Sequence, residues 1–96
     1  MKVFISGPVS GTSDYKERFA AAEKAIEEAG DTPINPVKLT EHLPDDTPWT
    51  VYMEISLAAL KNCDAIYMLT GWVCSTGANI ENLWALGSGK EIIREK

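Results

Sequence analysis

The stretch Gly71-Trp-Val-Cys-Ser-Thr-Gly-Ala-Asn-Ile-Glu81 leads from one apolar segment into a second apolar segment of different character. Residues 65–69, Ala-Ile-Tyr-Met-Leu, are typical of a buried strand, and residues 77–86 are typical of a helix. A loop that leads from a strand into a helix directs free N–H groups outward, where they can hold an anionic or polyhydroxyl ligand. Glu81 lies about one turn into this helix, so its carboxylate is predicted beside the same loop.

The same stretch also has a purely structural interpretation. Ser75 or Thr76 can serve as the N-cap of the helix, and Glu81 can be a first-turn acid that complements the helix dipole. The segments that the fold brings close to this loop decide between the two interpretations.

Strand and helix signals alternate along the rest of the chain. Apolar or β-branched segments predict strands, and apolar residues at three- and four-residue spacing predict helices. The strands are expected at residues 2–6, 31–36, 65–69 and 91–93, and the helices at residues 15–29, 47–62 and 77–86, with Pro48 in the first turn of the second helix. Pro33 favours the sheet edge for the second strand. The segment from Val37 to Pro48 is predicted to be a loop, whose length favours a lid or an interface.

This alternation predicts an α/β fold in a single domain over residues 1–96. The expected architecture is a small flavodoxin-like (Rossmann-like) three-layer domain with a parallel sheet in the strand order 2-1-3-4. Ligands of such sheets bind at the carboxyl ends of the first and third strands, where the chain winds away in opposite senses. Two loops rich in glycine and serine leave these ends, at residues 7–13 and 71–77. Their convergence favours a binding site.

Composition and charge limit the classes of partner. The chain has 96 residues and a formal net charge of −5, so it has no basic stripe for a nucleic-acid polymer, although backbone amides can hold the phosphate of a small nucleotide. Neither a signal peptide nor an apolar segment of membrane-spanning length is recognisable. Cys63 and Cys74 lack metal-ligand spacing, and the sole histidine, His42, is predicted in a surface loop. We therefore expect a cytoplasmic protein with no metal, no cofactor and no membrane partner.

The predicted pocket contains hydroxyls, glycine amides and a single carboxylate. Its polar side chains are expected from Ser6, Ser10, Ser75, Thr76 and Glu81. The chain has no Ser–His–Asp arrangement and no Walker A motif, and no Gly-x-Gly-x-x-Gly follows the first strand. A lone carboxylate can act as a general base, or as a nucleophile at a carbon with oxocarbenium character, such as the anomeric carbon of a sugar. Asp64 lies at the opposite end of the central strand and is assigned a structural role.

Three segments carry a resemblance to a known family: Lys2-Val-Phe-Ile-Ser-Gly-Pro8, Cys63-Asp-Ala-Ile66, and Gly71-Trp-x-x-Ser-x-Gly-Ala-x-x-Glu81. Together they resemble small bacterial and phage proteins of the DUF4406 type. That family is similar to nucleoside 2-deoxyribosyltransferases and to deoxyribonucleoside monophosphate N-glycosidases. The resemblance covers nearly the whole chain, and the Ser-x-Gly-x-x-x-Glu spacing is its most specific part.

The resemblance implies a flavodoxin-like enzyme, a hydrolase or a transferase, that cleaves or exchanges the N-glycosidic bond of a nucleoside or nucleotide. It implies Glu81 as the nucleophile, which displaces the base and forms a covalent sugar ester that water or a second base resolves. Ser75 and Gly77 match positions that hold a 5′-phosphate in the N-glycosidases, and Gly7 matches a glycine of the first-strand loop. A homo-oligomer is implied as well, because a neighbouring subunit often completes the sites of these relatives.

Two loops supply the remaining predicted binding residues. Ser10 and Gly11 are expected to contact the ligand from the first loop. Trp72 is a candidate for stacking on a base at the pocket mouth, with packing on the domain or on a partner as the alternative. Trp84 is expected in the core or in an interface, and Trp49 in a lid or a dimer contact.

Three positions depart from the pattern of the relatives. The transferases carry a tyrosine on the first strand that orients the nucleophile, where this chain has Phe4. The relatives carry an aspartate in the helix before the central strand, where this chain has Ser56, with Glu54 two residues away. The N-glycosidases carry an arginine in the first loop, near Ser10. These departures support a second hypothesis, a non-catalytic nucleotide-binding module, and a third and weaker one is an interaction protein that uses its tryptophans.

Overall fold

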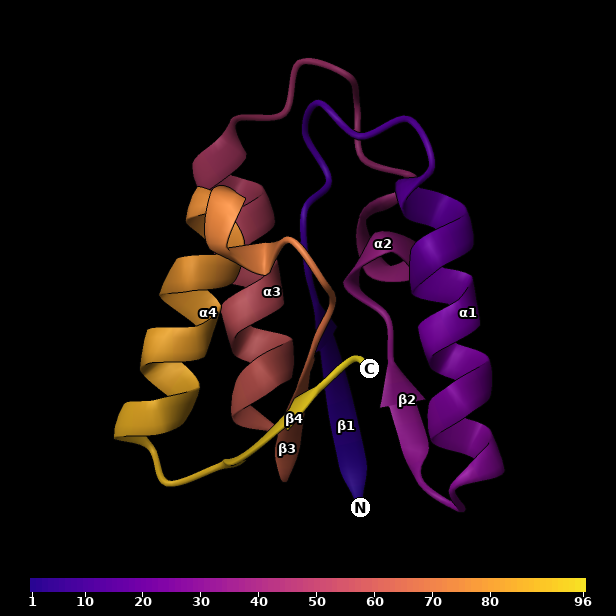
Figure 1. The fold of residues 1–96 in the computed structure, drawn as a ribbon. Helices are drawn as coiled ribbons and strands as arrows, with labels where there is room; N and C mark the ends of the chain where they lie inside the picture. The colour runs from indigo at the N-terminus through magenta and orange to yellow at the C-terminus, as the bar shows by residue number, and fades with distance from the viewer.

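The computed structural model describes residues 1–96. It shows a four-stranded parallel sheet with helices on both faces (Figure 1). The elements in chain order are β1 (Lys2–Ser6), α1 (Tyr15–Glu28), β2 (Thr32–Ile34), α2 (Pro36–Thr40), α3 (Trp49–Lys61), β3 (Ala65–Met68), the 3-10 helix η1 (Trp72–Cys74), α4 (Thr76–Gly87) and β4 (Glu91–Arg94). The strand order is β2-β1-β3-β4, with every neighbouring pair parallel. The predicted flavodoxin-like α/β fold and its strand order are therefore confirmed.

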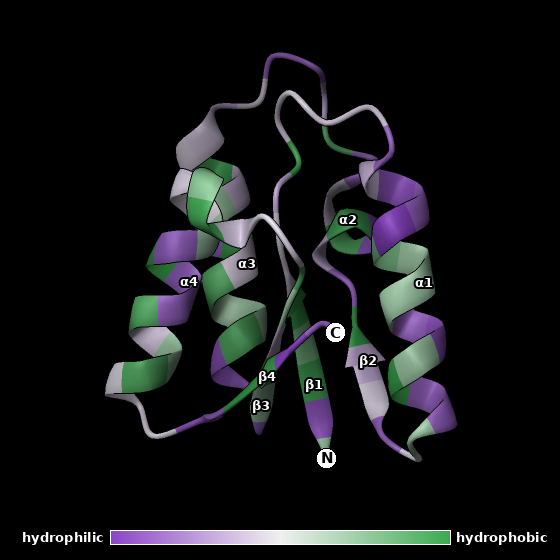
Figure 2. Cartoon of the chain, viewed as in Figure 1, coloured by the Kyte–Doolittle hydropathy of each residue, from purple (hydrophilic) through white to green (hydrophobic).

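β1 and β3 form the centre of the sheet, and their side chains divide the interior into two apolar clusters. The cluster on the α1 side contains Val3, Ile5, Phe19, Ala22, Ile26, Ala65 and Leu69, and the cluster on the α3 and α4 side contains Phe4, Leu60, Cys63, Ile66, Met68, Ala78 and Ala85. Alternate residues of a strand point to opposite faces. Ser6, two residues after Phe4, therefore directs its side chain toward α4. Figure 2 shows the apolar residues of the strands and helices in green.

The segment predicted as a loop from Val37 to Pro48 begins with a short helix, so that prediction was wrong in part. The Asn35 side chain accepts a hydrogen bond from the backbone N–H of Val37 at 3.0 Å and caps α2. Pro36 follows at the first helical position, where its missing N–H costs nothing. The helix has only five residues, too few for an apolar period to be visible in the sequence.

Two further details differ from the sequence predictions. Pro48 is the N-cap of α3, with ψ at 147°, and does not lie in the first turn of the helix. The 3-10 turn of η1 was not predicted. It follows from Gly71, whose φ of 88° reverses the chain directly after β3. None of the helices combines the length and the apolar character that a membrane span requires.

Candidate active site

A cleft of about 960 Å3 opens at the carboxyl edge of the sheet, between the loop after β1 and the start of α4. Parallel α/β sheets bind ligands at this place, because the chain leaves β1 and β3 in opposite directions. The cleft walls also include α2, the segment that joins α2 to α3, and the first two turns of α3. Seven of the residues that the sequence placed in the pocket line it: Ser6, Gly7, Ser10, Ser75, Thr76, Gly77 and Glu81.

Glu81 belongs to the inner face of α4. Ala78, Glu81, Asn82 and Ala85 are the buried residues of this helix, at the three- and four-residue spacing of one face. The Glu81 residue is only 6% exposed, and it lines the cleft. The first turn of α4 contains no acid, so Glu81 does not have the dipole-complementing role of the structural interpretation.

The Ser6 hydroxyl donates a hydrogen bond of 2.5 Å to Oε1 of Glu81. The contact joins two buried side chains, since Ser6 at the end of β1 is 1% exposed, and it is charge-assisted when Glu81 is ionised. Burial raises the pKa of Glu81 from its ordinary value of 4.5 to about 7, and the hydrogen bond from Ser6 opposes part of that rise. The carboxyl group is therefore divided between its neutral and ionised forms near neutral pH.

The start of α4 is held by its own side chains. The Ser75 hydroxyl caps the helix by accepting a hydrogen bond of 3.2 Å from the backbone N–H of Ala78. The Asn79 amide reaches back over the loop and donates to the carbonyl oxygens of Ser75, at 2.8 Å, and of Val73, at 3.0 Å. Ser75 is therefore an N-cap, as the structural interpretation has it, and it is a lining residue of the cleft as well.

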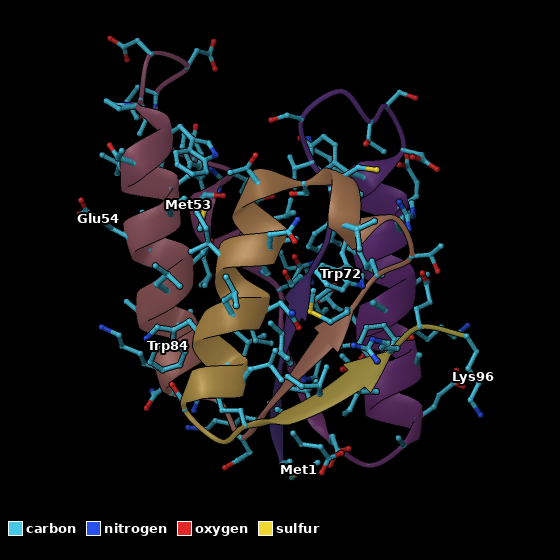
Figure 3. All side chains as sticks on the ribbon, turned by 60° about the vertical axis from the view of Figure 1, so that its left-hand side comes forward. Met1, Met53, Glu54, Trp72, Trp84 and Lys96 are labelled. Carbon is cyan, nitrogen blue, oxygen red and sulfur yellow. The ribbon has the colours of Figure 1, made fainter.

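Two glycines allow the close packing that shapes the cleft. A Cβ atom on Gly7 would lie 2.7 Å from the Leu69 side chain, so β1 and β3 end in contact that no larger residue would permit. A Cβ atom on Gly77 would lie 3.1 Å from Sδ of Met53. Met53 points from α3 toward α4, whereas Glu54 points away from the molecule (Figure 3).

Gly11 and Trp72, the two other predicted binding residues, are not among the residues that line the cleft. Gly11, with φ at 77°, turns the exposed tip of the first loop. Trp72 is half-buried and packs against the apolar cluster on the α4 side of the sheet, which is the packing alternative of the sequence analysis (Figure 3). The turn at Gly71 accounts for this, because it directs the next side chain back onto the domain.

Several cleft residues were not selected as binding residues from the sequence. Tyr15 and Lys16 begin α1, directly after the first loop, and that position signals the same edge of the sheet. Lys16 is the only basic residue of the cleft, whose acids are Glu41, Asp45 and Glu81.

Residues of α3 form one wall of the cleft. Ser56 of α3 is buried and lines the cleft, whereas Glu54 is exposed and outside it. Trp49 and Tyr52, at the start of α3, line it as well. No cluster of three or more His, Cys, Asp or Glu side chains is arranged to hold a metal ion.

Comparisons with known proteins agree with this architecture. The CMP N-glycosidase BcmB of Clostridium botulinum superimposes with a TM-score of 0.68 at 24% identity, over 98% of this chain and 70% of that protein. A 2-deoxyribosyltransferase of Bacillus psychrosaccharolyticus gives a TM-score of 0.67 at 18% identity, over 98% of this chain and 71% of that one. At these identities the likeness shows the fold. No curated protein matches the chain.

The family is shown by the sequence itself. The family model described as "Domain of unknown function (DUF4406)" matches residues 1–94. Because this match spans nearly the entire sequence, the chain belongs to the DUF4406 family.

Proposed function

We propose that this protein cleaves or exchanges the N-glycosidic bond of a nucleoside or nucleoside monophosphate, with Glu81 as the nucleophile. The observation that carries the proposal is the isolated Glu81 carboxyl group, buried and fixed by Ser6 at the cleft where two glycine-bearing loops meet. The names of the two similar structures, a CMP N-glycosidase and a 2-deoxyribosyltransferase, support the same bond as the target.

The proposed reaction uses the carboxylate at the anomeric carbon of the sugar. A bond forms between a carboxylate oxygen and C1′ while the bond from C1′ to the base nitrogen breaks. The base leaves with the electron pair and takes a proton from water in the cleft. In hydrolysis, a water molecule then attacks C1′ while its proton passes to the hydroxide left when the base was protonated, and the sugar is released. In transfer, a second base attacks C1′ instead and gives its N–H proton to that hydroxide. Both outcomes restore the Glu81 carboxylate.

The other lining residues support binding of the sugar end of such a substrate. Gly7 and Ser10 approach from the loop after β1, and Ser75 and Gly77 from the start of α4. Helix starts favour anions, because their first N–H groups are free and the helix dipole is positive there. Lys16 adds the one basic side chain of the cleft. Together they form the proposed binding subsite for a hydroxyl or phosphate on C5′.

The second candidate is a non-catalytic nucleotide-binding module. One observation favours it: the α3 wall of the cleft presents the Ser56 hydroxyl, and Glu54 of the same helix faces solvent. No acid of α3 is therefore placed to protonate a leaving base, and general acid catalysis is worth about a hundredfold or more in rate.

Incubation with a panel of nucleosides and their 5′-monophosphates, followed by chromatography of the free base, tests the proposal. The wild-type protein and the control Glu54→Gln are expected to release base from the same substrates. Glu81→Gln is expected to lose at least about a thousandfold in rate, because an amide is not a nucleophile at C1′. Thermal stabilisation by a ligand without base release would identify the binding module instead. Release at the wild-type rate by Glu81→Gln would refute the role of Glu81.

The proposal includes a homo-oligomer that forms through the outer face of α4. Ile80, Leu83 and Leu86 are exposed on this face, and Leu83 is 69% exposed. Residues 76–89 contain one ionisable side chain, Glu81, and it is buried. Two copies with a formal charge of −5 each repel one another, and an uncharged face reduces that repulsion where they meet. Trp49 lines the cleft, is half-exposed and lies near Gly77 at the start of α4, so a second copy that covers this end of α4 would lie close to the site.

A further inference from the structure

We propose that Ser6 is a positioning residue for Glu81: its hydroxyl holds Oε1 and leaves Oε2 as the oxygen that attacks the sugar. This inference rests on the proposed role of Glu81 as the nucleophile. It concerns a contact between the end of β1 and the second turn of α4, across a sequence separation of 75 residues.

The donor is fixed by the sheet. Ser6 is the last residue of β1 and pairs with Met68 of β3. Its carbonyl oxygen accepts a hydrogen bond of 2.8 Å from the backbone N–H of Leu69. The side chain is fully enclosed, and Glu81 is its hydrogen-bond acceptor. A short side chain on a central strand has little freedom, so the direction of the O–H group is set by the fold.

The two carboxylate oxygens of Glu81 have different surroundings. Oε1 accepts the hydrogen bond from Ser6, whereas Oε2 accepts none from the protein. Oδ1 of Asn82 is the only fully buried side-chain oxygen or nitrogen atom that has no hydrogen-bond partner, so Oε2 of Glu81 is not fully buried. Oε2 is therefore open to the cleft that Glu81 lines. With Oε1 held, rotation of the carboxyl group is restricted and Oε2 faces the ligand.

Removal of the hydroxyl is expected to act on the rate more than on binding. A hydrogen bond to a carboxylate that is lost from a buried site lowers a rate by about ten- to a hundredfold when it orders the reacting group. Ser6 also lowers the pKa of Glu81, so its loss shifts the ionisation of the carboxyl group to higher pH. Neither effect requires contact between Ser6 and the substrate.

Other titratable groups line the same cleft: Tyr15 and Lys16 of α1, Glu41 and Asp45 between α2 and α3, Tyr52 of α3, and Cys74 of η1. Burial raises the pKa of Glu81 and the hydrogen bond from Ser6 lowers it, and these other groups are not among the causes of the shift. A change in its titration on substitution of Ser6 therefore reports the hydrogen bond itself.

The test compares Ser6→Ala, Ser6→Cys and the control Ser88→Ala. Ser88 makes a hydrogen bond to the Trp84 carbonyl at the far end of α4. We expect Ser6→Ala to lower kcat by about ten- to a hundredfold with little change in KM, and to move the acid limb of the kcat/KM profile to higher pH. Ser6→Cys puts a somewhat larger thiol in place of the hydroxyl and keeps a weak donor, so we expect it to recover part of both effects. Ser88→Ala is expected to match the wild type.

Titration of the Glu81 side-chain carboxyl carbon by NMR, in the ligand-free wild type and in the variants, separates the two proposals. A higher pKa of Glu81 in Ser6→Ala supports the contact whether or not a substrate has been found. An unchanged titration, or an unchanged kcat and pH profile, overturns the role of Ser6 and leaves the nucleophile untouched. If no substrate releases base, the proposed role of Glu81 as the nucleophile is refuted, and so is the attacking role of Oε2. If Ser6→Ala does not fold, the same readings are taken on Ser6→Cys.

Discussion

Two helices on opposite faces of the sheet, α1 and α4, distribute their charge in opposite ways. The surface of α1 carries Lys16, Glu17, Arg18, Glu23, Lys24, Glu27 and Glu28, while its inner face is apolar. In α4 the one ionisable side chain, Glu81, faces inward, and Leu83 and Leu86 face outward. Amphipathic surface helices follow the pattern of α1. An inverted pattern places a carboxyl group where it destabilises the fold, which is typical of a functional site.

The largest expected effect on stability comes from that inverted carboxyl group. Its pKa is about 7 in the folded protein against an ordinary value of 4.5, so the folded state binds the proton more tightly. Stability from this group is complete below pH 4.5 and is lost as the pH rises through 7. The loss by pH 8 amounts to about 3 kcal/mol of unfolding free energy.

Urea unfolding at pH 5 and pH 8 measures this loss. Glu81→Gln cannot ionise, so its unfolding free energy is expected to lose the part of the pH dependence that Glu81 causes. The matched change on α1, Glu27→Gln, affects an exposed residue and is expected to preserve the wild-type dependence. Equal pH dependence in the wild type and in Glu81→Gln would show that burial does not penalise the charged carboxylate.

The apolar outer face of α4 gives the second prediction. Leu83→Glu puts a charge on that face and is expected to weaken self-association by about ten- to a hundredfold, because each charge would have to be buried or repelled at the contact. Lys24→Glu makes a charge change of the same sign on the exposed face of α1 and is expected to change association far less. Analytical ultracentrifugation over a range of concentrations checks both. Dissociation that is equal in the two variants would place the interface elsewhere.

The smallest expected effect compares two asparagines of α4. Asn79 donates hydrogen bonds to carbonyl oxygens of the preceding loop, whereas Oδ1 of Asn82 is buried without a partner. Asn79→Ala is expected to lower the unfolding free energy by about 1–2 kcal/mol, and Asn82→Ala by less than about 1 kcal/mol. Thermal unfolding at one pH distinguishes them. The reverse order would mean that Asn82 contributes through packing.

The fold was predictable because each element has a clear local pattern. β1 and β3 are short and apolar, α1 has a regular apolar face, and glycines mark the ends of α1 and α4. Alternation of strands and helices then leaves few topologies. The short helix α2 was missed because five residues show no period, although the Asn35-Pro36 pair is a recognisable start signal.

The sequence predicted where the candidate site lies better than it predicted which side chains make contact there. The topology alone brings the loop that carries Gly7 and the start of α4, which carries Gly77, to one edge of the sheet. The direction of the Trp72 side chain depends on the left-handed turn at Gly71, which a residue pattern does not specify. Ser6 was expected in the pocket, but its pairing with Glu81 depends on how closely α4 packs on β1.

The Gly7–Leu69 contact has a consequence for how ligands enter. Because hard contact joins the ends of β1 and β3, the spacing between the two loops is set when the sheet forms, and no hinge at this point can widen it. A ligand therefore meets an aperture of preset width. The packing of the sheet therefore sets the distance between the two loops at this edge of the cleft.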